Sequence, residues 1–297
     1  MGRTENAAAT TVCLAEFDTN LLICVGIAAG LSKDVAIGDV CYTGTIVDVL
    51  DNAKITQLPG GKQQIKLSPT FYSTPRALVT PIALHRIHPA TKPAHLKWAT
   101  EQGKAARTLI PNEFSGRTGK RECVKEPIVR EGVIACGLVS DSTEYNEQLI
   151  GIDRKLLALE TESGGLFSIG QSRQIPALTI RSISDFAGAG IDKTIFEQQT
   201  DNNARKVAAL NASIFLTHQL RSAGVRSYLE RRRSIRSASD LQPSFFPYHH
   251  LISLKTYWSK AMTSSAENFG FFRRASRCCQ KVIACRCREF ELFNEPA

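Results

Sequence analysis

The sequence of 297 residues lacks the features that mark membrane and secreted proteins. Its longest apolar run, LLICVGIAAGL at 21–31, is about half of the ~20 residues that a membrane-spanning helix needs. No secretory signal stands at its start. Its nine cysteines are scattered, which together with the lack of a signal predicts a reduced, cytoplasmic protein. The thiols that we expect in the core are those of Cys13, Cys24, Cys41, Cys123 and Cys136.

Motifs for metals and common cofactors are also missing. Gly26 and Gly30 follow an apolar run, but G-x-x-x-G does not match the G-x-G-x-x-G fingerprint of dinucleotide-binding folds. The segment GRTGK at 116–120 has the wrong spacer for a phosphate loop and predicts a basic surface loop. The cysteines at 278–287 fit the paired spacing of zinc ligands poorly. We therefore predict no metal and no cofactor.

Strong charge of either sign is absent from most of the chain. The net charge is +9, but residues 221–297 hold 14 Lys and Arg against six Asp and Glu, which leaves +1 for residues 1–220. This shift predicts a domain over 1–220 and a basic C-terminal extension over 221–297. The extension can be a basic arm for nucleic acid or anionic membrane, a partner-binding appendage, or a non-native product of a shifted reading frame. We favour an irregular segment without an assignable function, ahead of a nucleic-acid arm.

What the sequence does have is two short apolar runs that each end on acids. KLLALETESGGLFSIG at 155–170 places Glu160 and Glu162 after one run, and IPALTIRSISDFAG at 175–188 places Asp185 after the other. Such runs are typical of strands buried on both faces, and SGGLFSIGQS between them has the length of a crossover helix. If the two strands are parallel neighbours, Glu162 and Asp185 face one crevice. The alternative is that the acids only cap the segments that follow them.

Other segments complete an α/β pattern. Residues 5–17 predict a helix, 19–31 a buried strand that ends in a glycine turn, and 202–220 a last helix packed on the sheet. The Pro-, Gly- and Thr-rich stretch over 52–125 predicts short strands and turns, followed by a helix near 94–110. His85, His88 and His95 lie in this stretch without a Cys or acid at ligand spacing, so we expect them at the surface or in loops.

Three blocks together resemble the nucleoside phosphorylase and methylthioadenosine/S-adenosylhomocysteine nucleosidase superfamily. They are VGIAAGLSKDVAIGDV at 25–40, LALETESGG at 157–165 and TIRSISDFAG at 179–188. The resemblance spans about residues 2–220. It implies a three-layer α/β/α sandwich around a mixed sheet, a purine nucleoside or nucleotide as the small-molecule partner, and a homodimer.

The resemblance also implies roles for particular residues. Glu162 is expected to hold the ribose hydroxyls, within the motif formed with Glu160 and Thr161. Asp185, with Ser184 before it, is expected to assist protonation of the purine leaving group. The remaining residues are a sugar and nucleophile loop of Gly26, Ile27, Ala28, Ala29 and Gly30, and a purine contact at Leu138 and Val139.

Three departures from the family pattern shape the functional prediction. Phosphorylases of the superfamily carry a phosphate-binding arginine at the position of Cys24, and a thiol cannot replace that cation. The central residue of the E-x-E motif, usually Met in the nucleosidases, is Thr161. The chain starts beyond the family's first strand, so we expect an unpaired sheet edge that favours association. We predict hydrolysis of a purine N-glycosidic bond, with a non-catalytic nucleoside sensor or an inactive remnant as the alternative.

Overall fold

A computed structural model describes residues 2–50, 53–57, 63–110, 126–140, 142–187, 202–239 and 281–284. The predicted loop at 116–120, Cys123 and the tail cysteines at 278–287 lie outside these ranges. Within them, no helix is both long and apolar enough to cross a membrane.

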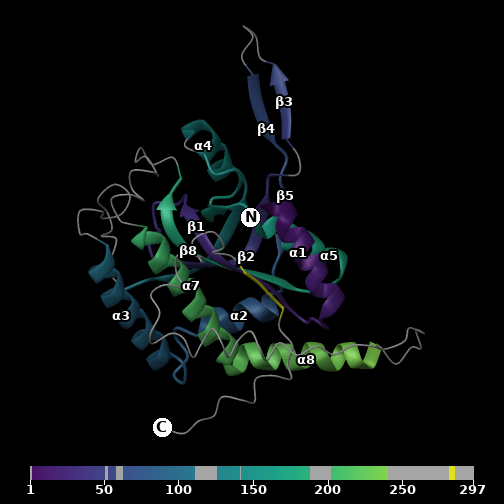
Figure 1. Ribbon diagram of the computed structural model, residues 1–297, viewed down its shortest axis with the longest axis vertical. Helices are drawn as coiled ribbons and strands as arrows, with labels where there is room; N and C mark the ends of the chain where they lie inside the picture. The colour runs from purple at the N-terminus through teal and green to yellow at the C-terminus, as the bar shows by residue number, and fades with distance from the viewer. Residues whose placement is uncertain are drawn as a thin grey trace.

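The chain alternates helices and strands around one large sheet (Figure 1). In chain order the elements are α1 Arg3–Glu16, β1 Leu22–Gly30, β2 Val40–Asp48, β3 Ala53–Gln57, β4 Gln63–Leu67, β5 Thr70–Ser73, α2 Arg76–Leu84, α3 Lys92–Leu109, β6 Val129–Cys136, α4 Thr143–Ile152, β7 Leu156–Glu160, α5 Ser163–Ser172, β8 Ala177–Phe186, α7 Asn203–Arg221, α8 Ala223–Ser239 and β9 Lys281–Ala284.

The large sheet is mixed, as the family resemblance implies. Its order is β5-β2-β6-β7-β1-β8, and β8 also pairs with β2, so the path of strands closes on itself. β6 is parallel to β2 and β7, and β8 is parallel to β1, whereas β1 with β7 and β2 with β8 are antiparallel. Strands β3 and β4 form a separate hairpin that projects from the body (Figure 1).

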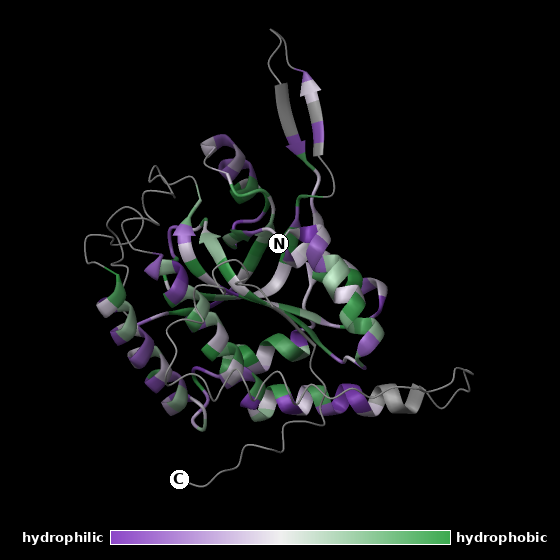
Figure 2. Ribbon diagram, in the orientation of Figure 1, coloured by the Kyte–Doolittle hydropathy of each residue, from purple (hydrophilic) through white to green (hydrophobic). Residues whose placement is uncertain are grey.

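Helices cover the sheet on two sides, which confirms the layered α/β fold. On one side, helix α1 packs against α5 (Figure 1). On the other side, α7 packs on β1 and β8, and α3 and α8 pack against α7. Helix α2 packs against α8. Figure 2 shows the central strands as mainly hydrophobic and much of α8 as hydrophilic. The core therefore lies between the sheet and the two helical layers.

The burial of β1 on both faces explains its unbroken apolar sequence. Leu21, Ile23 and Val25 belong to the core cluster that includes residues of α2, α3 and α7. Leu22 and Cys24 belong to the cluster on the opposite face, which includes residues of α5. Alternate side chains of a strand point to opposite faces, so both sets must be apolar when helices cover both.

The predicted helices form close to their expected positions, but one prediction about the strands is wrong. The segments predicted at 5–17, 94–110, 163–172 and 202–220 correspond to α1, α3, α5 and α7. Strands β7 and β8 also form, yet β1 lies between them, antiparallel to β7 and parallel to β8, so they are neither neighbours nor parallel. Short buried runs show that a strand exists but not which strand it pairs with.

The chain also departs from prediction at its C-terminal side. The domain continues past residue 220, because Val225, Tyr228 and Leu229 of α8 are buried in the same core cluster as Leu78 of α2. Only these few apolar residues stand out in an Arg-rich stretch, which is why the helix was not expected to pack. The irregular extension is contradicted there and at β9, and its other residues lie outside the described ranges.

Two further expectations are corrected. We expected an unpaired edge of the sheet, but the side of β1 at residues 22–25 carries β9, which pairs with it antiparallel. His85 lies in the turn after α2, as expected for a loop residue, but it is 6% exposed and not at the surface, because it turns into the helical layer beside His95.

Candidate functional site

Strand β1 places the three predicted motifs beside one another. Ala29 pairs with Leu159 of β7 on one side and with Asp185 of β8 on the other. Gly26, nearer the start of β1, pairs with Arg181 of β8. The predicted sugar and nucleophile loop is therefore the second half of β1, and it runs between the two acidic motifs.

Glu160 ends β7 and anchors the start of α5. Its carboxylate accepts hydrogen bonds from the backbone N–H of Glu162 at 3.0 Å and from that of Ser163 at 3.0 and 3.1 Å. An acid at this position satisfies backbone donors that the first turn of a helix leaves open. Glu160 therefore caps the next segment, but this is not its only role, because it also contacts Arg181.

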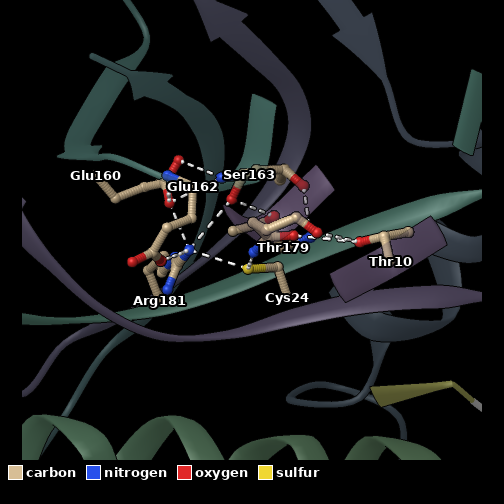
Figure 3. A network of polar contacts seen from close by, with 9 residues as sticks. Thr10, Cys24, Glu160, Glu162, Ser163, Thr179 and Arg181 are labelled. Carbon is tan, nitrogen blue, oxygen red and sulfur yellow. Dashed lines mark hydrogen bonds and ion pairs between the residues drawn. The ribbon is translucent and has the colours of Figure 1, made fainter. Parts of the chain in front are cut away.

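The centre of the site is Arg181, which is fully buried on β8 (Figure 3). One of its terminal nitrogens contacts Glu160 and also donates to Oε2 of Glu162 at 2.9 Å. The same nitrogen lies 3.0 Å from Sγ of Cys24 and 3.4 Å from Oγ of Ser163. Glu160 and Glu162 are 3% and 1% exposed, so two carboxylates share one guanidinium away from bulk water.

The electrostatics of this group favour a charged Arg181. Burial alone would lower the pKa of Arg181, but Cys24, Glu160 and Glu162 hold it above its ordinary value. Burial raises the pKa of Glu162, opposed by the charge of Arg181 and reinforced by that of Glu160. Burial also raises the pKa of Cys24 to about 11, so its thiol is neutral near pH 7.

Helix α1 covers this group from one side. Nδ2 of Asn6 donates to Sγ of Cys24 at 3.6 Å, and Nε of Arg3 pairs with Oδ2 of Asp48 at 2.6 Å. Asp48 is fully buried at the end of β2, so its charge is balanced from the first turn of α1. The small residues Gly164 and Gly165 permit this approach, because a Cβ on Gly165 would lie 2.1 Å from the carbonyl oxygen of Arg3.

A chain of hydroxyl groups fixes the start of α5 against the sheet. Oγ1 of Thr179 donates to Oγ of Ser163 at 2.8 Å (Figure 3). The backbone N–H of Thr179 donates to Oγ1 of Thr43 at 3.1 Å. Buried polar groups that are bonded in this way hold one geometry. The position of Glu162, directly before Ser163, is set by the same contacts.

Asp185 is positioned by an irregularity in β8. Ala28 pairs with Ile183 and Ala29 with Asp185, so Ser184 is an extra residue at a β-bulge. Oγ of Ser184 donates to Oδ2 of Asp185 at 2.8 Å, and Asp185 is 6% exposed. Bulges re-aim side chains at functional sites. Because a strand rises about 3.3 Å per residue, Asp185 lies about 13 Å along β8 from Arg181.

The other predicted residues are placed as follows. Thr161 is half-buried between the two glutamates. Leu138 and Val139 follow β6 and are 65% and 45% exposed. Their loop adjoins the end of β7, because the N–H of Gly137 donates to the carbonyl oxygen of Glu160 at 2.8 Å. The expected purine contact is therefore next to the acidic motif but on the surface.

Arg181 is not among the predicted site residues, although it lies within the motif at 179–188. The signal was a single arginine inside the otherwise apolar and small-residue run LTIRSIS. A charge at the centre of a buried strand requires a buried partner of opposite sign, and the nearby E-x-E motif offered two. Across the described ranges, no group of three or more His, Cys, Asp and Glu residues is arranged to hold a metal ion.

Comparisons with known proteins agree with this architecture. The sequence model described as the phosphorylase superfamily matches residues 1–217. ATP nucleosidase Cap17 of Escherichia coli is 24% identical over 232 residues, which cover 76% of this chain but 41% of that protein. The chain therefore spans less than half the length of this curated relative.

Two solved structures each match about three quarters of this chain. Futalosine hydrolase of Helicobacter pylori is 20% identical, with a TM-score of 0.48, over 74% of this chain and 76% of that one. The 5'-methylthioadenosine/S-adenosylhomocysteine nucleosidase of Neisseria meningitidis, in complex with methylthio-immucillin-A, is 19% identical, with a TM-score of 0.48, over 74% and 77%.

Proposed function

Because the chain belongs to the phosphorylase superfamily, we propose that it cleaves the N-glycosidic bond of a purine nucleoside or nucleotide by hydrolysis. The observation that carries this proposal is the buried contact of Arg181 with Glu160, Glu162 and the neutral thiol of Cys24. This group lies beside the second half of β1, which pairs with the part of β8 from Arg181 to Asp185.

The reaction needs two carboxyl groups in different states. Positive charge builds on the sugar as the bond to the base breaks, and the departing purine must accept a proton. Glu162 suits the first task, because Arg181 supports its charge through Oε2, while Oε1 has no hydrogen-bond partner within the described part of the chain and can accept from the ribose diol. Asp185, oriented by Ser184, donates the proton. A positioned proton donor contributes about 10²- to 10⁴-fold in rate.

The charges at the site favour water over phosphate as the nucleophile. A phosphorylase must bind a phosphate dianion with cations that are free to pair with it. Cys24 supplies no charge, and Arg181 already contacts two carboxylates. A phosphate would therefore meet excess negative charge, whereas a water molecule has no net charge to be repelled.

The proposal extends to the surroundings of these residues. Gly26, Ile27, Ala28, Ala29 and Gly30 face the sugar and the attacking water, and Leu138 and Val139 contact the purine. The exposure of Leu138 and Val139 is consistent with a surface that the substrate or a second protomer covers. A homodimer and a cytoplasmic location belong to the same proposal.

The test is chromatographic detection of free base. The protein is incubated with adenosine, inosine, AMP, ATP, methylthioadenosine and S-adenosylhomocysteine, each with and without phosphate. We expect base release that does not require phosphate and that falls at least ~10²-fold in Asp185→Asn. The control is Glu147→Gln, an exposed change on α4.

Two results would contradict the proposal. Release that requires phosphate would show phosphorolysis. Saturable nucleoside binding in calorimetry, without release of base from any of these compounds, would favour a non-catalytic sensor. Near-ultraviolet circular dichroism of Asp185→Asn, compared with the unchanged protein, checks that the variant keeps its fold.

A further inference from the structure

A separate pocket opens on the other side of the sheet from the carboxylate group. It has a volume of about 240 Å³ and is lined by Tyr42 of β2, Glu131 of β6, Phe215 of α7, His95 of α3, and His85 and Arg86, which follow α2. Tyr42 belongs to the core cluster on the α7 side, whereas its neighbour Cys41 belongs to the cluster on the α5 side. The first residues of β6 also line the pocket, whereas Glu160 pairs with Cys136 at the other end of that strand. The pocket and the carboxylate group lie on opposite faces of the sheet, although Arg181 pairs with Cys41, the neighbour of Tyr42.

The basic groups at the pocket outnumber the acids that neutralise them. Glu131 is paired with Arg76 at 2.5 Å, so its charge is compensated. Arg130 also lines the pocket, and its Nε lies 3.7 Å from Oδ2 of Asp39, too far for a hydrogen bond. The Asp39 carboxylate instead accepts from two backbone N–H groups, those of Ala36 and Ile128.

Arg86 contributes a positive charge without an ion pair among the described residues. Within the described ranges, the pocket therefore carries one guanidinium without an ion pair, that of Arg86, and one weakly paired guanidinium, that of Arg130. Guanidinium groups that are not occupied by carboxylates bind oxyanions through parallel N–H donors.

His85 provides the second observation that points to a ligand. Its side chain lines the pocket, the residue is 6% exposed, and neither Nδ1 nor Nε2 has a hydrogen-bond partner among the residues that the structure describes. Buried polar side chains are bonded in most proteins, so an imidazole with two open nitrogens indicates a missing partner. The ring centroids of His85 and His95 are 6.0 Å apart, and that of His95 is 5.4 Å from Trp98, which restricts how the imidazoles can turn.

We propose that this pocket binds the phosphate group of a small ligand, with Arg86 and Arg130 as charged donors and His85 and His95 as further donors. Tyr42 and Phe215 then supply an apolar floor for the part of the ligand that carries the phosphate. The carboxylate group around Arg181 plays no part in this binding, so the site is independent of glycosidic cleavage.

Binding of an anion has a measurable signature in the histidines. Burial, reinforced by His95 and His218, lowers the pKa of His85 to about 4, and burial with Arg86 and His218 lowers that of His95. An oxyanion beside them favours the protonated imidazole, so both pKa values rise when it binds. By linkage, the affinity for a phosphate of fixed charge increases as the pH falls and the histidines take up protons.

The experiment is a titration of histidine-labelled protein with inorganic phosphate and with pyrophosphate, followed by NMR of the imidazole resonances. The pH is 6.0, and sodium chloride keeps the ionic strength constant. We expect saturable shifts of the His85 and His95 signals, which His85→Gln and His95→Gln identify. The exposed His88 is the internal control.

Two variants decide between a built site and general attraction. Arg86→Gln, an exposed change that the fold tolerates, is expected to weaken binding at least ~10-fold, because a charge-assisted bond is lost. Asp185→Asn is expected to leave the titration unchanged, which separates this pocket from the glycosidic site. A linear response without saturation, equal in Arg86→Gln and the unchanged protein, would show an adventitious ion only and would overturn the proposal.

Discussion

Replacing Arg181 with methionine tests the buried ion cluster that supports the proposed function. The change keeps much of the side-chain length but removes the charge that contacts Glu160 and Glu162. These carboxylates are 3% and 1% exposed, so water does not take over the role of the guanidinium. Removing one partner from a buried pair costs about 3–5 kcal/mol, a large part of the 5–15 kcal/mol that stabilises a typical domain.

The loss should depend on pH in a defined direction. Without Arg181, the two carboxylates repel each other, and at least one folded-state pKa rises above the unfolded value of about 4.3. A group whose pKa is raised by folding stabilises the protein below its unfolded pKa, and this contribution is lost as the pH rises through the folded value. The deficit of Arg181→Met relative to the unchanged protein should therefore grow between pH 5.5 and 8.0, by about 1.4 kcal/mol per pH unit while one proton is released.

Urea unfolding at 25 °C, at both pH values, measures the effect. Arg173→Met is the matched control, because Arg173 is exposed at the end of α5. The triple change Arg181→Met, Glu160→Gln and Glu162→Gln removes all three charges and should abolish the pH dependence. A deficit below about 1 kcal/mol at pH 8.0, or an equal deficit at both pH values, would refute the reasoning.

Three further outcomes follow from the same structure. Gly165→Ala should destabilise the protein by at least about 1–3 kcal/mol in urea unfolding, because the new Cβ would lie 2.1 Å from the carbonyl oxygen of Arg3. Gly151→Ala on α4, where a Cβ meets open space, should instead stabilise the protein by up to about 1 kcal/mol. From pH 8 to pH 5 in phosphate-free buffer, the free energy of unfolding should fall by about 2 kcal/mol, because His85 has a pKa of about 4 in the folded protein and binds its proton at a higher pH in the unfolded chain. The fall should be smaller in His85→Gln, and equal falls in the two proteins would contradict this reasoning. Because burial raises the pKa of Glu162, the activity should begin to fall in acid at a pH above the ordinary pKa of a glutamate. If the acid side of the pH–activity profile has its midpoint at or below about pH 4, Glu162 is not the ionised group.

The sequence predicts the elements of this fold well because burial on both faces leaves a strong signal. The runs that became β1 and β8 are apolar or small at nearly every position, and both are buried along almost their whole length. The ten-residue segment between the acidic motifs becomes α5 with the expected bounds. These features are local, so composition and periodicity are sufficient to find them.

Strand order and long-range contacts were not predictable in the same way. The pairing of β1 between β7 and β8 depends on residues more than 100 positions apart, and no periodicity encodes it. The packing of α8 depends on three apolar residues in a strongly basic segment. That Arg181 has buried acidic partners could have been predicted, because a lone charge in a buried strand requires partners. The sequence does not show which acids it contacts.

The order of the strands also explains why β1 is rich in small residues. Arg181 projects from β8 and contacts the glutamates at the end of β7, although β1 lies between these strands. Paired residues point to the same face of a sheet, so Gly26, the partner of Arg181, lies on the path between them, and side chains at alternate positions such as Cys24 and Ala28 share that face. A large side chain at Gly26 would separate the guanidinium from the carboxylates. The small residues that first indicated a glycine turn are therefore better explained by the passage of a buried ion pair across the strand.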